Sequence, residues 1–386
     1  MYCGDTFNFL ADNMKVLHIC SDYSGSKVHY NLYKSLDSRL DRQTVYAYYD
    51  SSDIPANNNF RTRNSEIVYD DILNKYLRRI YPIREEWVFY NMKKKISLSE
   101  YDCVHATTLF GDGGIAYKIN KKYGTPYIVV VRSTDIIYIK KYPRLLSSYT
   151  EKIIRNASYI VFVTQVLFDS LKNMMQISRV WEDNADKMLV LPNGINDYWI
   201  DNLYKEEKRN NYRICYAGLF YKRKNILRLI EAVDLLHSDY PDLQLHIVGD
   251  NGSDEAEINR LANNIDFVHL HKRISDKDEM LDFYRSNSVF AMPSWGETFG
   301  LVYVEALTQK MRILYSKGEG VDGMFENVGV AVDPYSVESI RDGLHRILVN
   351  FDNFDGMKNI NYNTFRWDYI ADKYLSLYQK AIRNKF

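Results

Sequence analysis

Two glutamates, Glu297 and Glu305, stand eight positions apart in a segment that passes from an apolar stretch through a glycine-bearing turn into helix-forming sequence. We expect a helix over residues 299–309. The first N–H groups of a helix have no intrahelical partner and carry partial positive charge, so they can hold a phosphate or diphosphate. Gly300 lacks a Cβ and lets a ligand approach the backbone closely. Glu305, farther along, could accept hydrogen bonds from ribose hydroxyls, and Glu297 would face the group that the diphosphate carries.

A plainer interpretation exists for each glutamate taken alone. A glutamate in the first turn of a helix is favourable on dipole grounds, and one in the second turn is commonly a solvated surface residue. The combination of both with the glycine turn is what favours a binding site.

Four segments together resemble the retaining nucleotide-sugar glycosyltransferases of family GT4. The first, residues 293–306, is similar to the E-x7-E signature of that family. The second, Pro192-Asn193-Gly194, is similar to its "PNG" turn. The third, Ala217-Gly218 with Lys224-Asn225, is similar to its "G…KN" donor-phosphate segment. The fourth, Ile247-Val248-Gly249-Asp250, is similar to its "VGDG" strand end. The resemblance extends over residues 14–386, in the family's order and spacing.

The resemblance implies the α/β GT-B architecture, with two doubly wound Rossmann-like domains that face each other across a cleft. We expect an N-terminal acceptor domain over residues 1–196 and a C-terminal donor domain over 197–367. A final helix, 368–386, would cross back onto the first domain.

Short β-branched and aromatic runs that alternate with helical patterns support this fold independently, because such alternation is typical of parallel sheets with right-handed crossovers. Residues 70–95 read as a long, helix-prone stretch interrupted at Pro82, and residues 1–13 read as irregular. The expected strands are 15–20, 44–49, 103–105, 127–131, 159–164, 188–191, 212–217, 243–248, 267–270, 289–292 and 312–315. The expected helices are 27–36, 227–236, 254–263, 277–286, 299–309 and 367–383.

The resemblance also implies which residues bind the donor and which carry the reaction. The donor-binding residues would be Gly218, Arg223, Lys224, Gly249, Arg273, Glu297, Thr298, Phe299, Gly300, Leu301 and Glu305. Lys224 and Arg223 would neutralise the departing diphosphate, and backbone groups near Arg273 would meet the base. Alternatively, these cations belong to a solvated basic surface loop with no role in binding. Where the family commonly has an arginine directly after the glycine, this chain has Leu219.

In the first domain, Gly25, His105, Arg132 and Asp135 are the candidate acceptor-binding residues. Glu297, Lys224 and His105 are the candidate catalytic residues. Many relatives have a second histidine where this chain has Thr107, and a lone histidine at a strand end is often structural. Arg132 could hold an anionic group of the acceptor, or it could pair with Asp135 and only shape the loop.

The resemblance implies a mechanism without a covalent intermediate, in which the diphosphate leaves and the acceptor hydroxyl attacks the same face. Such a mechanism needs no metal and no cofactor other than the donor substrate. Two alternatives remain open: another enzyme on this fold, such as a sugar-nucleotide epimerase or a phosphorylase, and a non-catalytic nucleotide-sugar binding protein.

Bulk composition limits the partners and the location. The 386 residues carry equal numbers of basic and acidic side chains, which argues against a dedicated nucleic-acid binder. Four cysteines without paired spacing indicate neither a disulfide framework nor a zinc motif, and so favour a reducing cytoplasm. No apolar run is long enough to span a membrane, and we identify no signal peptide.

The stretch Lys75–Lys95 contains seven basic residues interleaved with Trp87, Phe89 and Tyr90. It could rest on an anionic membrane surface, which would suit an enzyme that glycosylates a lipid-linked acceptor. Alternatively, it is an ordinary surface helix whose aromatic residues face the core.

Overall fold

The computed structural model describes residues 14–50, 58, 60, 62–74, 76–77, 81–174 and 178–384. It divides the chain into two compact units. One contains the residues up to 163, 167–194 and those from 367 onward; the other contains 164–166 and 195–366. The domains expected from the sequence end at residues 196 and 367. The expectation for residues 1–13 lies outside the described residues.

The first unit is built on a seven-stranded parallel sheet in the order β3-β2-β1-β4-β5-β6-β7. The strands are β1 (Lys15–Ile19), β2 (Arg42–Asp50), β3 (Ser65–Leu73), β4 (Cys103–Ala106), β5 (Tyr127–Val131), β6 (Tyr159–Phe162) and β7 (Met188–Val190). The strand order reverses between β1 and β4. Ligands of open parallel sheets bind at such reversals, beside the carboxyl ends of the strands.

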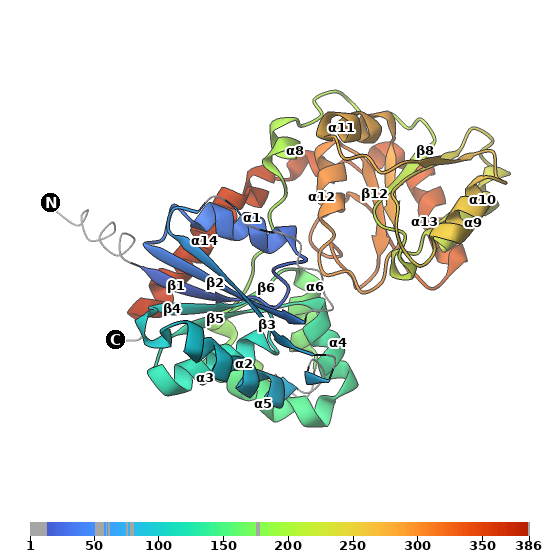
Figure 1. Ribbon diagram of the computed structural model, residues 1–386. Helices are drawn as coiled ribbons and strands as arrows, with labels where there is room; N and C mark the ends of the chain where they lie inside the picture. The colour runs from blue at the N-terminus through green and yellow to red at the C-terminus, as the bar shows by residue number, and fades with distance from the viewer. Residues whose placement is uncertain are drawn as a thin grey trace. The chain divides into compact units, whose positions relative to one another are not determined.

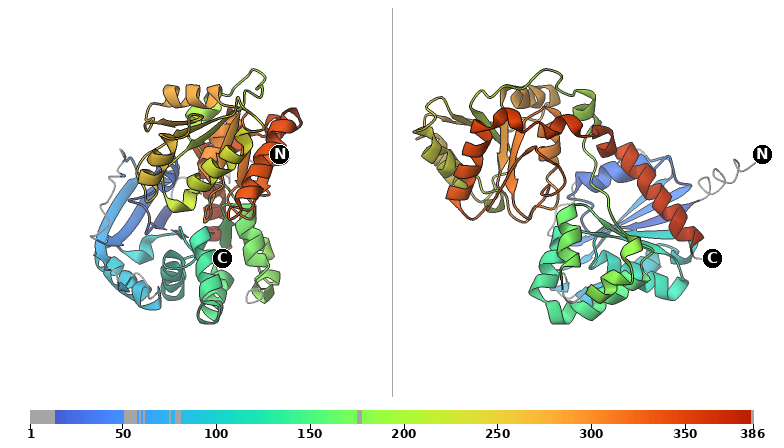
Figure 2. Two further views of the ribbon diagram at one scale, coloured as in Figure 1. Left: turned by 90° about the vertical axis from the view of Figure 1, so that its right-hand side faces the viewer. Right: turned by 180° about the vertical axis from the view of Figure 1, so that it is seen from behind.

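Helices cover both faces of this sheet. α1 (Lys27–Leu36) and α14 (Trp367–Arg383) pack together on one face, so the last helix of the chain joins the first unit (Figures 1 and 2). α2 (Tyr81–Lys95), α3 (Asp112–Tyr123) and α5 (Pro143–Asn156) cover the other face (Figure 1). The other α-helices described before residue 194 are α4 (Ser133–Lys141), α6 (Gln165–Lys172) and α7 (Ser178–Glu182). Helix α8 (Asp197–Asp201) belongs to the second unit.

The second unit repeats the plan with a six-stranded parallel sheet in the order β10-β9-β8-β11-β12-β13. The strands are β8 (Arg213–Ala217), β9 (Gln244–Val248), β10 (Val268–His271), β11 (Val289–Met292), β12 (Arg312–Ser316) and β13 (Gly329–Val332). The helices are α9 (Ile226–His237), α10 (Glu255–Ala262), α11 (Lys277–Ser286), α12 (Leu301–Thr308) and α13 (Val337–Val349). Here the strand order reverses between β8 and β11.

The prediction of one helix-prone stretch over 70–95 is wrong in its first part, because Asp70–Leu73 belongs to β3. Asp70 is buried there and accepts hydrogen bonds from the Tyr46 hydroxyl and from Lys95 Nζ, the latter at 2.6 Å. These partners, distant in the sequence, satisfy the Asp70 carboxylate, whose burial in a strand would otherwise be unfavourable. The helix itself begins at Tyr81, with Pro82 in its first turn, where a missing N–H costs nothing.

Two further differences concern helix and strand ends. α12 begins at Leu301 rather than at residue 299, because Gly300 takes a left-handed conformation with φ of 78° and stands at the N-cap. Strand β13 and the helices α3 to α8 and α13 have no counterpart among the residue ranges expected from the sequence. Among the described residues, no helix is both long and apolar enough to cross a membrane.

Candidate active site

A cavity of about 270 Å³ opens beside the carboxyl ends of β8 and β9 in the second unit. Its lining includes four residues that the sequence predicted as donor-binding: Gly218, Gly249, Arg273 and Glu305. It also includes residues that the sequence did not single out for binding. These are Ala217, Leu219, Val248, Asp250, Ile274, Met280, Tyr284 and Val302.

Two glycines bring the ends of β8 and β9 together at the wall of this cavity. Gly218 N donates a hydrogen bond to the Val248 carbonyl at 3.0 Å. A Cβ on Gly249 would lie 1.9 Å from the Gly218 carbonyl oxygen. Any side chain at position 249 would therefore push these strand ends apart and change the shape of the cavity.

Glu305, in the second turn of α12, contributes the carboxylate of the cavity wall. Burial raises the pKa of Glu305 to about 7, and the neighbouring Trp199 and Tyr284 side chains oppose that rise. The rings of Trp199 and Tyr284 lie 5.4 Å apart, centroid to centroid. A carboxylate at the wall of a largely apolar cavity, next to two aromatic side chains, is suited to accepting hydrogen bonds from ligand hydroxyls.

Arg273 and Asp250 form the polar rim of the same cavity. Arg273 Nη1 lies 3.8 Å from Asp250 Oδ1, and the Arg273 side chain is 62% exposed. Leu219, which replaces the expected arginine, is 39% exposed and also lines the cavity. The position therefore offers apolar surface to a ligand instead of charge.

A second cluster places two cations beside Glu297, which lies between β11 and α12. Lys224 Nζ lies 2.5 Å from Glu297 Oε2, and Arg223 Nη1 lies 3.7 Å from the same oxygen. Only 14% of the Lys224 and Glu297 side chains is exposed, whereas Arg223 is 48% exposed. The three charged side chains thus lie together at one edge of the sheet. Their predicted roles, binding the diphosphate and the group that it carries, require this proximity.

Backbone hydrogen bonds fix the turn that carries Glu297. Its N–H donates to Glu319 Oε2 at 3.0 Å, and its carbonyl accepts from Gly320 N at 3.2 Å. The Trp295 N–H donates to the Arg223 carbonyl at 2.9 Å, so the turn is also tied to the cations. Sequence reasoning missed Glu319, because its position beside Glu297 results from the fold.

The predicted phosphate-binding turn contains both buried and partly exposed side chains. The side chain of Phe299 is buried in the core, so only its backbone can serve a ligand. Thr298 and Leu301 are partly exposed and flank Gly300. A Cβ on Gly300 would lie 2.6 Å from Tyr303 Cδ2, which is a second reason for glycine there.

In the first unit, two of the four residues predicted to bind the acceptor are buried. His105 is 1% exposed, stacks on Tyr374 and lies with Nδ1 2.7 Å from the Tyr378 hydroxyl, so it packs α14 onto β4 in the core. Burial lowers the pKa of His105 to about 3. A buried, neutral ring of this kind does not support the predicted catalytic and acceptor-binding roles.

Asp135 is likewise buried, and it accepts hydrogen bonds from the backbone N–H groups of Arg132 and Phe110 at 2.9 and 3.0 Å. Burial raises its pKa to about 6. Through these backbone hydrogen bonds it shapes the start of α4. Arg132 remains partly exposed, with Nε donating to the Thr107 carbonyl at 2.9 Å, and Gly25 lies on an exposed turn.

The aromatic residues of the basic stretch lie on different sides of helix α2. Phe89 faces the core, whereas Ile83, Trp87 and Tyr90 are 55%, 43% and 52% exposed. Spacings of four and three residues put these three on one side of the helix. Lys75, Arg78 and Arg79 of that stretch lie outside the described residues.

Comparison with known proteins finds a family model that matches most of the second unit. Residues 201–364 match the model of the glycosyl transferases group 1 family. Together with the relatives described next, this match identifies the chain as a glycosyltransferase. This glycosyltransferase is 25% identical, over 353 residues, to an uncharacterized glycosyltransferase of Methanocaldococcus jannaschii, which covers 81% of this chain and 87% of that protein.

The glycosyltransferase is also 25% identical, over 236 residues, to the capsular polysaccharide biosynthesis glycosyltransferase CapM of Staphylococcus aureus, covering 57% of this chain and 60% of CapM. Among solved structures, it resembles sucrose-phosphate synthase from Thermosynechococcus elongatus with a TM-score of 0.68. That match has 18% identity and covers 96% of this chain and 100% of the other. It shows that this glycosyltransferase has the GT-B fold.

Within the described part of the glycosyltransferase, no group of three or more His, Cys, Asp or Glu side chains is arranged to hold a metal ion.

Proposed function

We propose that this chain is a retaining glycosyltransferase that moves a sugar from a nucleoside-diphosphate donor to a glycan or lipid-linked glycan in surface polysaccharide synthesis. The observation that carries the proposal is the pairing, in one unit, of a carboxylate-walled cavity with the Lys224–Glu297–Arg223 cluster. The similarity to CapM supports the choice of polysaccharide synthesis.

In the proposed complex, the nucleoside occupies the cavity and Glu305 accepts hydrogen bonds from its ribose hydroxyls. The close approach of Gly218 and Gly249 leaves room for the diphosphate to pass along the backbone. Lys224 and Arg223 bind the diphosphate, together with N–H groups at the start of α12. Glu297 is then released from Lys224 and holds hydroxyls of the donor sugar.

The reaction breaks the bond between the anomeric carbon and the diphosphate oxygen, and the electron pair leaves with the nucleoside diphosphate. The acceptor hydroxyl oxygen forms the new bond on the same face, and its proton passes to the leaving phosphate. Lys224 and Arg223 stabilise the negative charge that develops on the leaving group. The proposal requires neither a metal ion nor a further cofactor.

We propose that the first unit binds the acceptor near Gly25 and Arg132. The Arg132 guanidinium is anchored through Nε to the Thr107 carbonyl, which leaves its two terminal amino groups to face an anionic acceptor such as a lipid diphosphate. Such an acceptor would lie in a membrane.

The exposed side of α2 offers the means of reaching it. Ile83, Trp87 and Tyr90 provide apolar and aromatic surface. Lys94 Nζ lies 4.0 Å from the Tyr90 ring centroid, and Lys93 lies over the Phe89 ring. Aromatic residues beside lysines suit the interface of an anionic membrane. We therefore propose a cytoplasmic protein that contacts the inner face of the membrane peripherally.

The test is a turnover assay with UDP-, GDP-, ADP- and CMP-sugars and a panel of glycan and lipid-linked acceptors, with the product analysed by NMR. A glycoside with the anomeric configuration of the donor would support the proposal. An inverted product would contradict the retaining mechanism. Release of an altered sugar nucleotide without acceptor would indicate an epimerase, and donor binding without any turnover would indicate a binding protein.

A further inference from the structure

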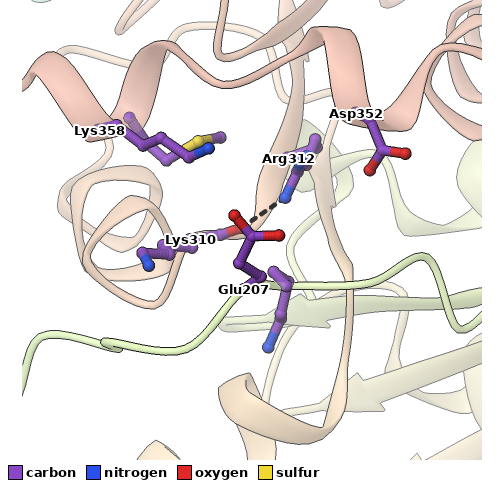
Figure 3. A pocket seen from close by; sticks show the side chains of 7 residues that line it. Glu207, Lys310, Arg312, Asp352 and Lys358 are labelled. Carbon is purple, nitrogen blue, oxygen red and sulfur yellow. Dashed lines mark hydrogen bonds between the residues drawn. The ribbon is translucent and has the colours of Figure 1, made fainter.

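A second pocket in the same unit lies at the amino end of β12, where Arg312 begins the strand. The cavity measures about 120 Å³. Figure 3 shows Arg312 on its strand, between the helical segment that carries Lys358 and the loop that carries Glu207. The lining residues are Glu207, Lys208, Lys310, Arg312, Asp352, Met357 and Lys358.

The floor of this pocket is made of buried positive charge. Lys208 is 8% exposed and Arg312 is 5% exposed. In the part of the chain that the structure describes, neither side chain has a carboxylate within ion-pair distance. Buried charges in proteins are ordinarily paired, because an unpaired charge costs much of its hydration.

Backbone carbonyls satisfy only some of the donors of these two cations. Lys208 Nζ donates to the carbonyls of Tyr284 and Arg285 at 3.1 and 2.6 Å. Arg312 Nε donates to Phe351 O at 3.0 Å, and Nη1 donates to Lys310 O at 3.1 Å. An ammonium has three N–H donors and a guanidinium has five, so both retain donors for a ligand.

The rim carries charges of both signs. Lys358, Glu207 and Asp352 are exposed there, and the whole lining has four basic and two acidic side chains. The pKa of Lys208 is lowered to about 8, by burial first and by the neighbouring charges of Arg285 and Arg312 as well. An anion in the pocket would remove this repulsion.

We propose that this pocket binds a phosphate group, either as inorganic phosphate or as the phosphoryl group of a small phosphate monoester. The cavity has room for roughly four waters at about 30 Å³ each, which suits one tetrahedral oxyanion and little more. Arg312 and Lys208 would bind it from the floor and Lys358 from the rim. The proposal does not depend on the donor or acceptor assignments above.

Two features separate this pocket from the donor cavity. The two cavities share no lining residue. Glu305 of α12 lines the donor cavity, whereas Lys310, two residues beyond the end of the same helix, lines the phosphate pocket.

The experiment measures phosphate binding by calorimetry and by the shift in melting temperature. Because the donor site also attracts phosphate, the reference protein is Lys224→Met. We expect that variant to retain one phosphate site. Lys358→Ala in the same background should weaken binding by about threefold to tenfold, while Glu207→Gln and Asp352→Asn should each tighten it by about threefold.

These three rim variants change exposed side chains, so loss of folding does not confuse the result. Arg312→Met should abolish binding, and its circular dichroism spectrum shows whether it is folded. Glycerol phosphate is the second probe: tighter binding than inorganic phosphate identifies a monoester as the ligand, and weaker binding identifies the free ion. No binding in Lys224→Met, or unchanged affinity in Glu207→Gln and Asp352→Asn, would overturn the proposal.

Discussion

Lys224 and Glu297 form a short ion pair at the carboxyl edge of the second sheet, with Nζ 2.5 Å from Oε2 and little exposure of either side chain. Such a pair is strong because water is largely excluded from it. In the proposed complex, a diphosphate that binds Lys224 competes with Glu297 and frees Glu297 for the donor sugar. The proposal thus couples binding of the leaving group to recognition of the sugar through this pair.

The first prediction concerns Lys224. Lys224→Ala should lower kcat by about 10²–10³-fold, since it removes a cation that stabilises the leaving diphosphate. Lys222→Ala is the matched control, because Lys222 belongs to the same short helical turn and is exposed. Steady-state kinetics would check both. Equal losses in the two variants would mean that the loop acts only through its overall charge.

The second prediction concerns Glu305 and pH. The folded protein keeps the proton of Glu305 up to about pH 7, whereas the unfolded chain loses it near the usual value of 4.5. Stability from this group is thus full below pH 4.5, falls as pH rises from about 4.5 to 7, and stays low above that. Glu305→Gln avoids the loss and should raise the free energy of unfolding at pH 8 by about 1–3 kcal/mol.

Glu305→Gln should also bind the donor substrate more weakly, by about tenfold or more. The amide replaces one carboxylate oxygen, which accepts a hydrogen bond from the ribose, with an NH₂ group that can only donate one. Urea unfolding at pH 4.5 and pH 8 measures the stability, and calorimetry measures donor affinity. A variant that is destabilised at pH 8, or that binds donor normally, would show that Glu305 is structural.

The third prediction separates His105 from catalysis. Tyr378→Phe removes the partner of His105 Nδ1 and should lower the free energy of unfolding by about 1–3 kcal/mol, with kcat unchanged. The depressed pKa of His105 keeps its stability contribution full above pH 6.5, and that contribution is lost as pH falls toward 3. His105→Phe should therefore be less sensitive to acid than Tyr378→Phe. A kcat defect in Tyr378→Phe would revive a catalytic role for the histidine.

The fourth prediction concerns the exposed side of α2. Ile83→Ser with Tyr90→Ser should reduce binding to anionic liposomes at low salt by about tenfold or more, because both side chains lose apolar surface. Tyr335→Ser is the control, since Tyr335 is 65% exposed but lies in the second unit. Co-sedimentation measures the effect. Absence of binding by the wild-type protein at low salt would contradict membrane contact.

Much of the fold could be predicted because β-branched runs and glycine turns are local signals. Strand β3 was missed because SEIVYDDIL contains three acidic residues, and only the folded chain brings Lys95 and Tyr46 to Asp70. Strand β13 was missed because its sequence, GVAV, contains glycine and alanine, which are weak strand signals.

The lining of the candidate donor cavity was predictable where glycines and charges mark it, as at Gly218, Gly249 and Glu305. Tyr284 and Met280 gave no signal, because apolar residues on a helix face usually indicate core packing. His105 stands at the end of a predicted strand, where the resemblance implies an acceptor-binding residue, and only the return of α14 to the first unit buries it.

The most direct test of the central claim is whether the second unit binds a nucleoside diphosphate. The melting temperature of the full chain should be measured with UDP, GDP, ADP and CDP, because a ligand that binds only the folded state raises it. We predict a clear rise with one of them, lost in Lys224→Ala, reduced in Glu305→Gln and kept in Lys222→Ala. No rise with any nucleotide would contradict the donor site. So would a rise that survives both Lys224→Ala and Glu305→Gln.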